Sequence, residues 1–258
     1  ENGQLDIVNT LLLITSNANK PNKKGQTPLI LAIQNGHVDV VHRLLSQMVG
    51  DDIDHGDVDG NTPLHYAAEN GQLDIVNTLL LITSNANKPN KSGQTPLMLA
   101  IRNGHVDVAH RLLRGVREVS NIDVDQGDVY GDTPLHYAAR EGLLDIVNTL
   151  LFITSNANKR NTWGQTPLML AIQNRHVEAA KRLSSQMVSD DVDQCDEDGD
   201  TPLHYAAEKG WEDVVRALLS RTKLVNVKNK EGSTPSMLAE RKGHHDLANL
   251  LSEWALNV

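Results

Sequence analysis

Apolar residues recur along this chain with the spacing of short amphipathic helices. In residues 62–94, two apolar stripes lie on either side of Gly71: Leu64, Ala67 and Ala68, then Ile75, Val76, Leu79 and Leu80. Each stripe follows a helical period and predicts a helix of about ten residues. Thr62 and Pro63 suit the N-cap and first position of the first helix, and Gly71 suits its end. The segment therefore predicts a turn, a helix, a tight reversal, a second helix and a loop.

The same pattern is repeated over the whole chain. Seven copies begin at Thr27, Thr62, Thr95, Thr133, Thr166, Thr201 and Thr234, separated by 35, 33, 38, 33, 35 and 33 residues. Two forms alternate, because the copies at 62, 133 and 201 read TPLHYAA, whereas those at 27, 95 and 166 read TPL, then Ile or Met, then LAI. Helices this short are unstable alone in water. Stability must come from stacking of neighbouring copies, which predicts an all-α solenoid of helix-turn-helix units with β-turn or hairpin loops.

The copy at residues 62–94 resembles the ankyrin repeat. The matching residues are TPLHYAA at 62–68, Gly71, Ile75-Val76, Leu79-Leu80, Asn87 and Gly93. The resemblance implies a single ankyrin-repeat domain, 1–258, with units 1–26 (partial), 27–61, 62–94, 95–132, 133–165, 166–200, 201–233 and 234–258 (a C-terminal cap). Because residue 1 falls inside a unit, we expect an uncapped apolar face there and further repeats upstream.

Two departures from the family pattern predict local differences. The histidine of TPLH is replaced in the second form and in the last copy by Ile30, Met98, Met169 and Met237, which removes the polar tie that histidine gives in the family. Arg175 replaces the glycine that ends the first helix, so a non-glycine residue must adopt a positive φ. We expect strain or a different helix end at Arg175.

Extra apolar residues follow the second helices. They are Leu13-Ile14, Leu81-Ile82 and Phe152-Ile153 in one form, and the added Met48-Val49 and Met187-Val188 in the other. We expect these pairs to pack together as a small satellite core at one end of the second helices. The alternative is an exposed apolar strip that binds a partner, and the exposure of Leu81, Ile82 and Phe152 decides between the two.

Composition narrows the functional classes. The 258 residues include eight aromatics and are 39% hydrophobic, which suits many small Leu-Ala interfaces better than one large core. A formal charge of −9 disfavours a general nucleic-acid binder. No apolar run approaches the roughly 18 residues that span a bilayer, so we expect no membrane insertion. The single cysteine, Cys195, favours a reducing compartment, and we expect an intracellular, cytoplasmic protein.

The sequence predicts no catalytic, cofactor or metal site. It contains no GxSxG, P-loop, HExxH or CxxC pattern. His65, His136 and His204 occupy the structural TPLH position. The neighbours His244 and His245 point apart on a helix, and Cys195 lies in an acidic loop, which argues against a nucleophile. We therefore expect no enzyme activity and no cofactor.

The resemblance instead implies a concave groove, formed by loop tips and first helices, that binds other proteins. Carried over residue by residue, it implies contact candidates at Lys23, Lys24, Asp59, Lys91 and Asp198 on the tips, and at Tyr66, Glu69, Arg102 and Tyr205 on the first helices. For Tyr66 and Tyr205 a packing role competes. The resemblance also implies a modification: Asn87 and Asn158, with Asn19 and Asn226, match the loop asparagine that is hydroxylated in some animal ankyrin repeats.

Tyr130 and Trp163 are the strongest contact candidates. They occupy adjacent loop tips, where side chains have little structural duty, and Trp, Tyr and Arg are the commonest interface anchors. With Tyr137 and Arg140 they form a predicted hot spot. The alternative is that these aromatic rings only pack on neighbouring tips.

The sequence thus favours a non-enzymatic protein–protein interaction module with a rigid surface, monomeric and with unidentified protein partners. One alternative is a substrate-recruiting segment of a larger enzyme or of a bacterial effector that acts in a host cytosol. Another is a structural array that self-associates through the uncapped end or the apolar strip.

Overall fold

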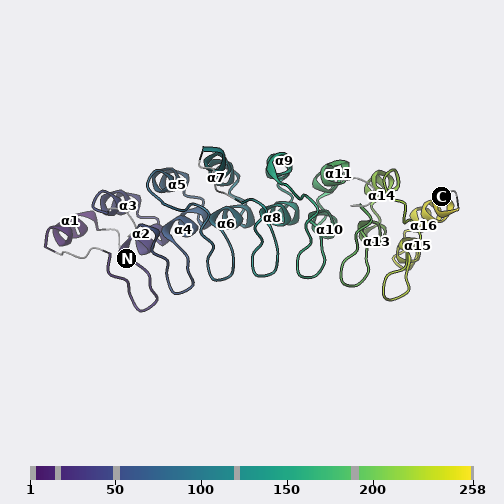
Figure 1. The fold of residues 1–258 in the computed structure, drawn as a ribbon, viewed down its shortest axis with the longest axis horizontal. Coiled ribbons are helices and arrows are strands. Elements are labelled where there is room, and N and C mark those ends of the chain that lie inside the picture. The colour runs from purple at the N-terminus through teal and green to yellow at the C-terminus, as the bar shows by residue number, and fades with distance from the viewer. Residues whose placement is uncertain (1–3, 15–18, 49–52, 119–122, 187–191, 257–258) are drawn as a thin grey trace. The chain divides into compact units, whose positions relative to one another are not determined.

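The computed structural model describes residues 4–14, 19–48, 53–118, 123–186 and 192–256, and these residues form helices and connecting loops without a β-strand (Figure 1). They divide into two compact units, Glu1–Asp123 and Val124–Val258. The division falls inside the predicted unit 95–132. Within each compact unit, helix pairs stack side by side and a hairpin-like loop precedes each first helix (Figure 1).

The Glu1–Asp123 unit contains one unpaired helix at its N-terminal end, followed by three helix pairs. Its helices are α1 (Leu5–Ile14), α2 (Pro28–Gln34), α3 (Val38–Leu45), α4 (Pro63–Glu69), α5 (Leu73–Leu80), α6 (Pro96–Arg102) and α7 (Val106–Glu118). The first helices α2, α4 and α6 pack in sequence order, and the second helices pack as α1 on α3 and α5 on α7. This is the expected all-α repeat fold.

The Val124–Val258 unit contains four helix pairs. They are α8 (Pro134–Glu141) with α9 (Leu144–Ile153), α10 (Pro167–Gln173) with α11 (Val177–Gln186), α13 (Pro202–Lys209) with α14 (Glu212–Leu219), and α15 (Pro235–Arg241) with α16 (His245–Ala255). The first helices α8, α10, α13 and α15 form one layer. Every one of them begins with proline after a threonine in extended conformation, as the sequence predicts.

The TPLH histidines tie one unit to the next. The backbone N–H of Thr62 donates to Nδ1 of His65 at 3.1 Å, so the ring proton lies on Nε2, which donates to the carbonyl of Gln94 at 3.1 Å. His136 and His204 repeat this arrangement. Burial lowers the pKa of His65 to about 4, against a smaller raising effect of the Gln94 bond, so the buried ring is neutral.

Methionine takes over part of this role in the other repeat form. The Thr95 N–H contacts the sulfur of Met98 at 3.5 Å, and Thr166 contacts Met169 at 3.4 Å. A thioether has no proton to donate, so the bond to the next hairpin is lost, whereas the N–H at the helix start keeps a weak acceptor. The expected loss of the polar tie therefore applies to the contact between units.

Arg175 has a φ of 68°, where the equivalent Gly36 and Gly104 have 72° and 73°. The predicted positive φ is confirmed. Arginine therefore adopts the left-handed conformation that costs a side chain with a Cβ about 1 kcal/mol or more. The following turn is kept, because the N–H of His176 still reaches the carbonyl of Ala171 at 2.9 Å.

The expectation that Leu81, Ile82 and Phe152 pack in a satellite core is wrong. Leu81, Ile82 and Phe152 are 80%, 40% and 81% exposed. Leu81 and Ile82 follow the end of α5, whereas Phe152 lies in the last turn of α9 and is turned to solvent. Met48 is half-buried, whereas Val49, Met187, Val188 and the side chains of Leu13 and Ile14 lie outside the described residues.

An uncovered apolar face is present on α1. Ile7 and Leu11 are 54% and 51% exposed, whereas the equivalent Ile75 and Leu79 of α5 are 1% exposed each. The two helices have the same sequence over this stretch. The difference arises because α4 packs on α5, whereas the main packing partner of α1 among the described elements is α3.

Candidate functional site

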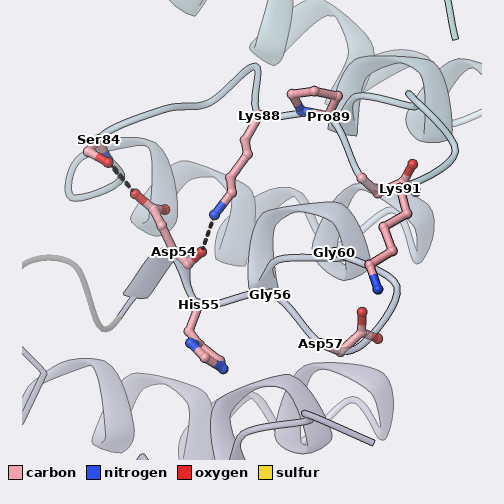
Figure 2. Close-up of a pocket in the computed structure, with 10 residues that line it drawn as sticks. Asp54, His55, Gly56, Asp57, Gly60, Ser84, Lys88, Pro89 and Lys91 are labelled. Atoms are coloured by element: carbon pink, nitrogen blue, oxygen red, sulfur yellow. Dashed lines mark hydrogen bonds between the residues drawn. The ribbon is translucent and has the colours of Figure 1, made fainter.

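A polar hollow of about 540 Å³ opens between two consecutive hairpins of the Glu1–Asp123 unit (Figure 2). The Asp54 carboxylate accepts hydrogen bonds from the Ser84 hydroxyl at 2.6 Å and from the Ser84 N–H at 2.8 Å. Lys88 Nζ donates to the Asp54 carbonyl at 3.0 Å. Figure 2 shows these groups turned toward one another across the hollow.

The same bonds recur in the Val124–Val258 unit. Asp125 accepts from Thr154 and Ser155, and Lys159 Nζ donates to its carbonyl at 2.7 Å. Burial alone would raise the pKa of Asp125, but the hydrogen bonds from Ser155 and Thr154 outweigh it and lower that pKa. Because the contacts repeat with the sequence and join consecutive hairpins, we assign this hollow to locking of the repeats.

A second hollow surrounds Cys195. It is lined by Arg160, Asp193, Gln194, Cys195, Lys223 and Leu224, and the thiol is exposed. The Asp193 carboxylate again accepts from Thr222 and from the Lys223 N–H. In the described part of the chain, no three His, Cys, Asp or Glu side chains lie close enough together to hold a metal ion.

Tyr130 and Trp163 are brought together by adjacent hairpins. Their ring centroids are 5.3 Å apart and the ring planes differ by 19°, which is a stacked pair. Tyr130 remains 54% exposed and Trp163 45% exposed. The hairpins are joined at this point by a backbone bond from the Thr162 N–H to the Tyr130 carbonyl at 2.8 Å. The pair thus presents aromatic surface to solvent from a fixed position.

Each tip residue is fixed by an Asp or Asn two positions earlier. Asp128 Oδ1 accepts from the Tyr130 N–H at 2.9 Å, and Asn161 Oδ1 accepts from the Trp163 N–H at 3.0 Å. The next two hairpins hold Asp198 and Glu231 in the same way. We call Tyr130, Trp163, Asp198 and Glu231 the tip row. Sequence reasoning missed the residues that hold it, although an Asx-turn pattern is readable at every tip.

Tyr137 supports the Tyr130 tip through Asp128. It is only 4% exposed, and its hydroxyl donates to Asp128 Oδ2 at 2.7 Å. The Arg140 guanidinium lies 5.5 Å from the Tyr137 ring centroid and donates to Asp132 at 2.6 Å. The expectation that Tyr137 contacts a partner directly is therefore wrong, because its ring is covered. Arg140 is partly exposed and stays a contact candidate.

Tyr66 and Tyr205 have the same supporting role. Their hydroxyls donate to Asp57 and Asp196, each at 2.5 Å, and both side chains are half-buried. Burial, with the bond to Asp57, raises the pKa of Tyr66 to about 12. The packing role therefore accounts for both residues.

The remaining contact candidates lie in the Glu1–Asp123 unit. Lys23, Lys24, Asp59 and Lys91 are exposed on its hairpin tips. Backbone bonds from Val58 to Lys24 and from Lys91 to Asp59 align these hairpins. On the first helices, Glu69 and Arg102 form an exposed ion pair at 3.3 Å. This surface carries both signs of charge and no aromatic residue at the tip position.

The predicted hydroxylation sites Asn87 and Asn158 lie in hydrogen-bonded turns. The N–H groups of Asn87 and Asn158 donate to Asn85 and Asn156, at 3.0 and 3.1 Å. Asn158 is 8% exposed. Modification of Asn158 would require local opening of the loop, and the assignment stays a prediction.

Comparison with known proteins decides the family. The family description "Ankyrin repeats (3 copies)" matches residues 1–88, 78–161, 152–223 and 186–258. The chain belongs to the ankyrin-repeat family. Ankyrin repeats are generally protein–protein interaction modules, and the resemblance seen in the TPLH segments is confirmed. None of the helices described for this chain is long and apolar enough to cross a membrane.

Curated relatives share only part of their length with this ankyrin-repeat chain. A Caenorhabditis elegans "Transient receptor potential cation channel subfamily A member 1 homolog" is 46% identical over 61 residues, which is 22% of this chain and 5% of that protein. The C. elegans "ANK repeat-containing protein nipk-1" is 36% identical over 88 residues, or 34% of this chain and 14% of the relative. "Probable E3 ubiquitin-protein ligase XBOS33" from Oryza sativa subsp. japonica is 43% identical over 58 residues, 22% and 11% respectively.

Proposed function

We propose that this ankyrin-repeat chain is a non-enzymatic recognition module whose partner protein contacts the tip row of the Val124–Val258 unit. The main observation behind this proposal is the exposed Tyr130–Trp163 stack, in a chain with only eight aromatic residues. Large aromatic side chains dominate the binding energy of protein interfaces. At the equivalent tips of the other unit the chain places Lys24, Asp59 and Ser92, so the turn itself does not require an aromatic residue.

Preorganisation supports this assignment. The Asx turns fix the backbone of Tyr130 and Trp163, and the stack restricts both rings. Beneath them, Asp128 is held by the Tyr137 hydroxyl. A surface that is ordered before binding loses little conformational freedom when the partner arrives.

The test is a pull-down that compares the wild type with a Tyr130→Ala/Trp163→Ala variant. We expect bound proteins to be lost from the double variant, since removing hot-spot aromatics costs a few kcal/mol of binding energy, or about tenfold or more in affinity. The matched control is Asp59→Ala/Ser92→Ala, which changes the equivalent tips. Thermal unfolding of all three proteins checks the fold. Equal capture by both variants and the wild type would refute the proposal.

A second candidate is a substrate-recruiting segment of a larger protein. It is favoured by the small share of the relatives that the chain spans, 5% and 14% for the two C. elegans proteins. It predicts that the captured partner is modified only when this chain is joined to further domains. Fusing the chain to a promiscuous biotin ligase and mapping the labelled partners would show whether the tip row directs the choice.

Self-association is the third candidate, and the exposed α1 face favours it. Ile7 and Leu11 are each more than half exposed on the same side of a helix. Light scattering over a concentration series measures the mass directly. Ile7→Ser/Leu11→Ser should abolish any dimer, whereas a monomer at all concentrations in the wild type removes this candidate.

A further inference from the structure

The tip row changes chemistry along its length. In hairpin order it reads Tyr130, Trp163, Asp198 and Glu231, two aromatic rings followed by two carboxylates. All four residues occupy the same turn position, since each N–H is bonded to the Asp or Asn two residues before it. Asp198 is therefore the direct counterpart of Trp163 on the next hairpin.

Trp163 offers one ring face to a partner. Its other face is stacked on Tyr130, from the preceding hairpin. On the opposite side the Glu197 N–H donates to the Trp163 carbonyl at 2.9 Å, which places the hairpin that carries Asp198 directly beside it. Packed helices, and with them the hairpins, are about 10 Å apart. Trp163 therefore lies between the Tyr130 ring on one side and the hairpin that carries Asp198 on the other.

The charge around the tip row is negative. Residues 128–132, 160–164, 196–200 and 228–232 carry seven carboxylates and three cations, Arg160, Lys228 and Lys230. Arg160 is held by its own hairpin, because its Nε donates to the Gly164 carbonyl at 3.0 Å. Glu231 is paired with Arg241 at 3.7 Å. The exposed carboxylates nearest to Trp163 are therefore those of Glu197 and Asp198.

We propose that the tip row binds an arginine side chain in an extended basic segment of the partner. The guanidinium stacks on the free face of Trp163 and donates hydrogen bonds to the Asp198 carboxylate. Arginine fits better than lysine because its guanidinium is planar, stacks on aromatic rings and donates two parallel bonds to a carboxylate. This inference rests on the proposed function and adds the chemistry of the partner to it.

The test uses the full chain and a capped peptide that repeats Gly-Ser-Arg three times. Versions with lysine or glutamate in place of arginine are the ligand controls. Titration of the ¹⁵N-labelled protein follows the Trp163 indole N–H, assigned by its loss in Trp163→Ala. We expect the arginine peptide to shift this signal, the lysine peptide to bind several-fold more weakly and the glutamate peptide to leave it unchanged.

Matched variants separate stacking from simple charge attraction. Trp163→Ala should weaken arginine-peptide binding about tenfold, the value of a partly desolvated cation–π contact. Asp198→Asn should weaken it several-fold. Their controls are Ser92→Ala and Asp59→Asn, which change the equivalent positions of the other unit and should leave binding unchanged. If Asp59→Asn weakens binding as much as Asp198→Asn, binding is non-specific and the inference is overturned.

Failure of this inference can be told apart from failure of the proposed function. If the arginine peptide does not bind, or binds no better than lysine, and Tyr130→Ala/Trp163→Ala still loses its captured proteins, the tip row binds a partner of other chemistry. In that case the arginine inference is wrong and the proposed function stands. If the double variant captures the same proteins as the wild type, the proposed function is wrong as well.

Discussion

The buried TPLH histidines should lower the free energy of unfolding at acid pH. Replacing one of them should remove its share of this loss. His65→Met is the perturbation, because the chain itself has Met98 and Met169 at this position, each completely buried. Methionine therefore fits the site and keeps a weak acceptor for the threonine N–H. At pH 7 we expect a loss of about 1 kcal/mol for the missing bond to Gln94.

The magnitude follows from the pKa of the buried ring. Burial lowers the pKa of His65 from 6.5 to about 4, with the Gln94 carbonyl opposing it. The unfolded chain therefore binds more protons than the folded one between pH 6.5 and pH 4, and stability falls as the pH falls through this window. Full loss corresponds to about 3 kcal/mol for this one histidine. Above pH 6.5 the ring is neutral in both states and the contribution is constant.

Urea unfolding at a series of pH values from 7 to 4 measures this effect. Aspartates and glutamates titrate in the same range, so the informative quantity is the difference between wild type and His65→Met. We expect that difference to shrink and then reverse as the pH falls, by up to about 3 kcal/mol. Met98→Leu is the control and should show a difference that is independent of pH. Parallel curves for wild type and His65→Met would refute the reasoning, because the ring would then titrate alike in both states.

Three further perturbations follow from the geometry. Arg175→Gly should raise the free energy of unfolding by about 1 kcal/mol, since glycine adopts a φ of 68° without the cost of a Cβ; an unchanged urea midpoint would show that the turn is not strained. Tyr137→Phe should cost about 1–3 kcal/mol, because it removes the donor to the buried Asp128 carboxylate, and weaker order of the Tyr130 backbone in NMR relaxation would accompany it. Adding a copy of residues 57–68 and a short linker ahead of Glu1 should raise Tm by several degrees by covering Ile7 and Leu11, an effect that a copy with Leu64→Asp should lack.

Much of the fold was readable from the sequence because its signals are local and repeated. Thr62 and Pro63 mark a helix start that the structure places at Pro63, and Gly71 ends the first helix with a φ of 68°. Even the departure at Arg175 was predictable, since the turn after the first helix needs a positive φ whatever residue occupies it. Repetition made each of these local inferences testable against the other copies.

The exposure of the residues expected to form a satellite core could not be predicted in this way. Leu81 is apolar and follows directly on a buried stripe, yet it is 80% exposed. Its exposure depends on where α5 ends and on which neighbouring helix reaches that far, and neither is encoded near the residue. An apolar side chain beyond the last turn of a helix has no partner fixed by the helical period.

The burial of Tyr137 is accompanied by two differences outside the motif, Arg140 in place of Glu69 and Asp132 in place of Asn61. Tyr66 and Tyr137 occupy the same TPLHYAA segment, but only Tyr137 is buried. Seven residues after the threonine, the first of these copies has Glu69 and the second has Arg140. Arginine can cover the ring and reach Asp132, whereas glutamate would be repelled by the carboxylates there. Tyr137 was predicted to contact a partner, but Arg140 lies over its ring, and Tyr137 instead supports the tip through its bond to Asp128.

Tyr130 and Trp163 do pack on each other, as one of the two interpretations predicted, and both rings are still accessible, so contact with a partner stays a prediction. Packing alone is a weak reason for their presence. A stacked pair contributes about 0.5–1.5 kcal/mol, and the equivalent hairpins form the same Asx turns with Asp59, Ser92 or Asp198 at the tip. The fold therefore gains little from two aromatic rings that remain 54% and 45% exposed. An ordered aromatic surface that the turn does not need is better explained by a partner that stacks against it.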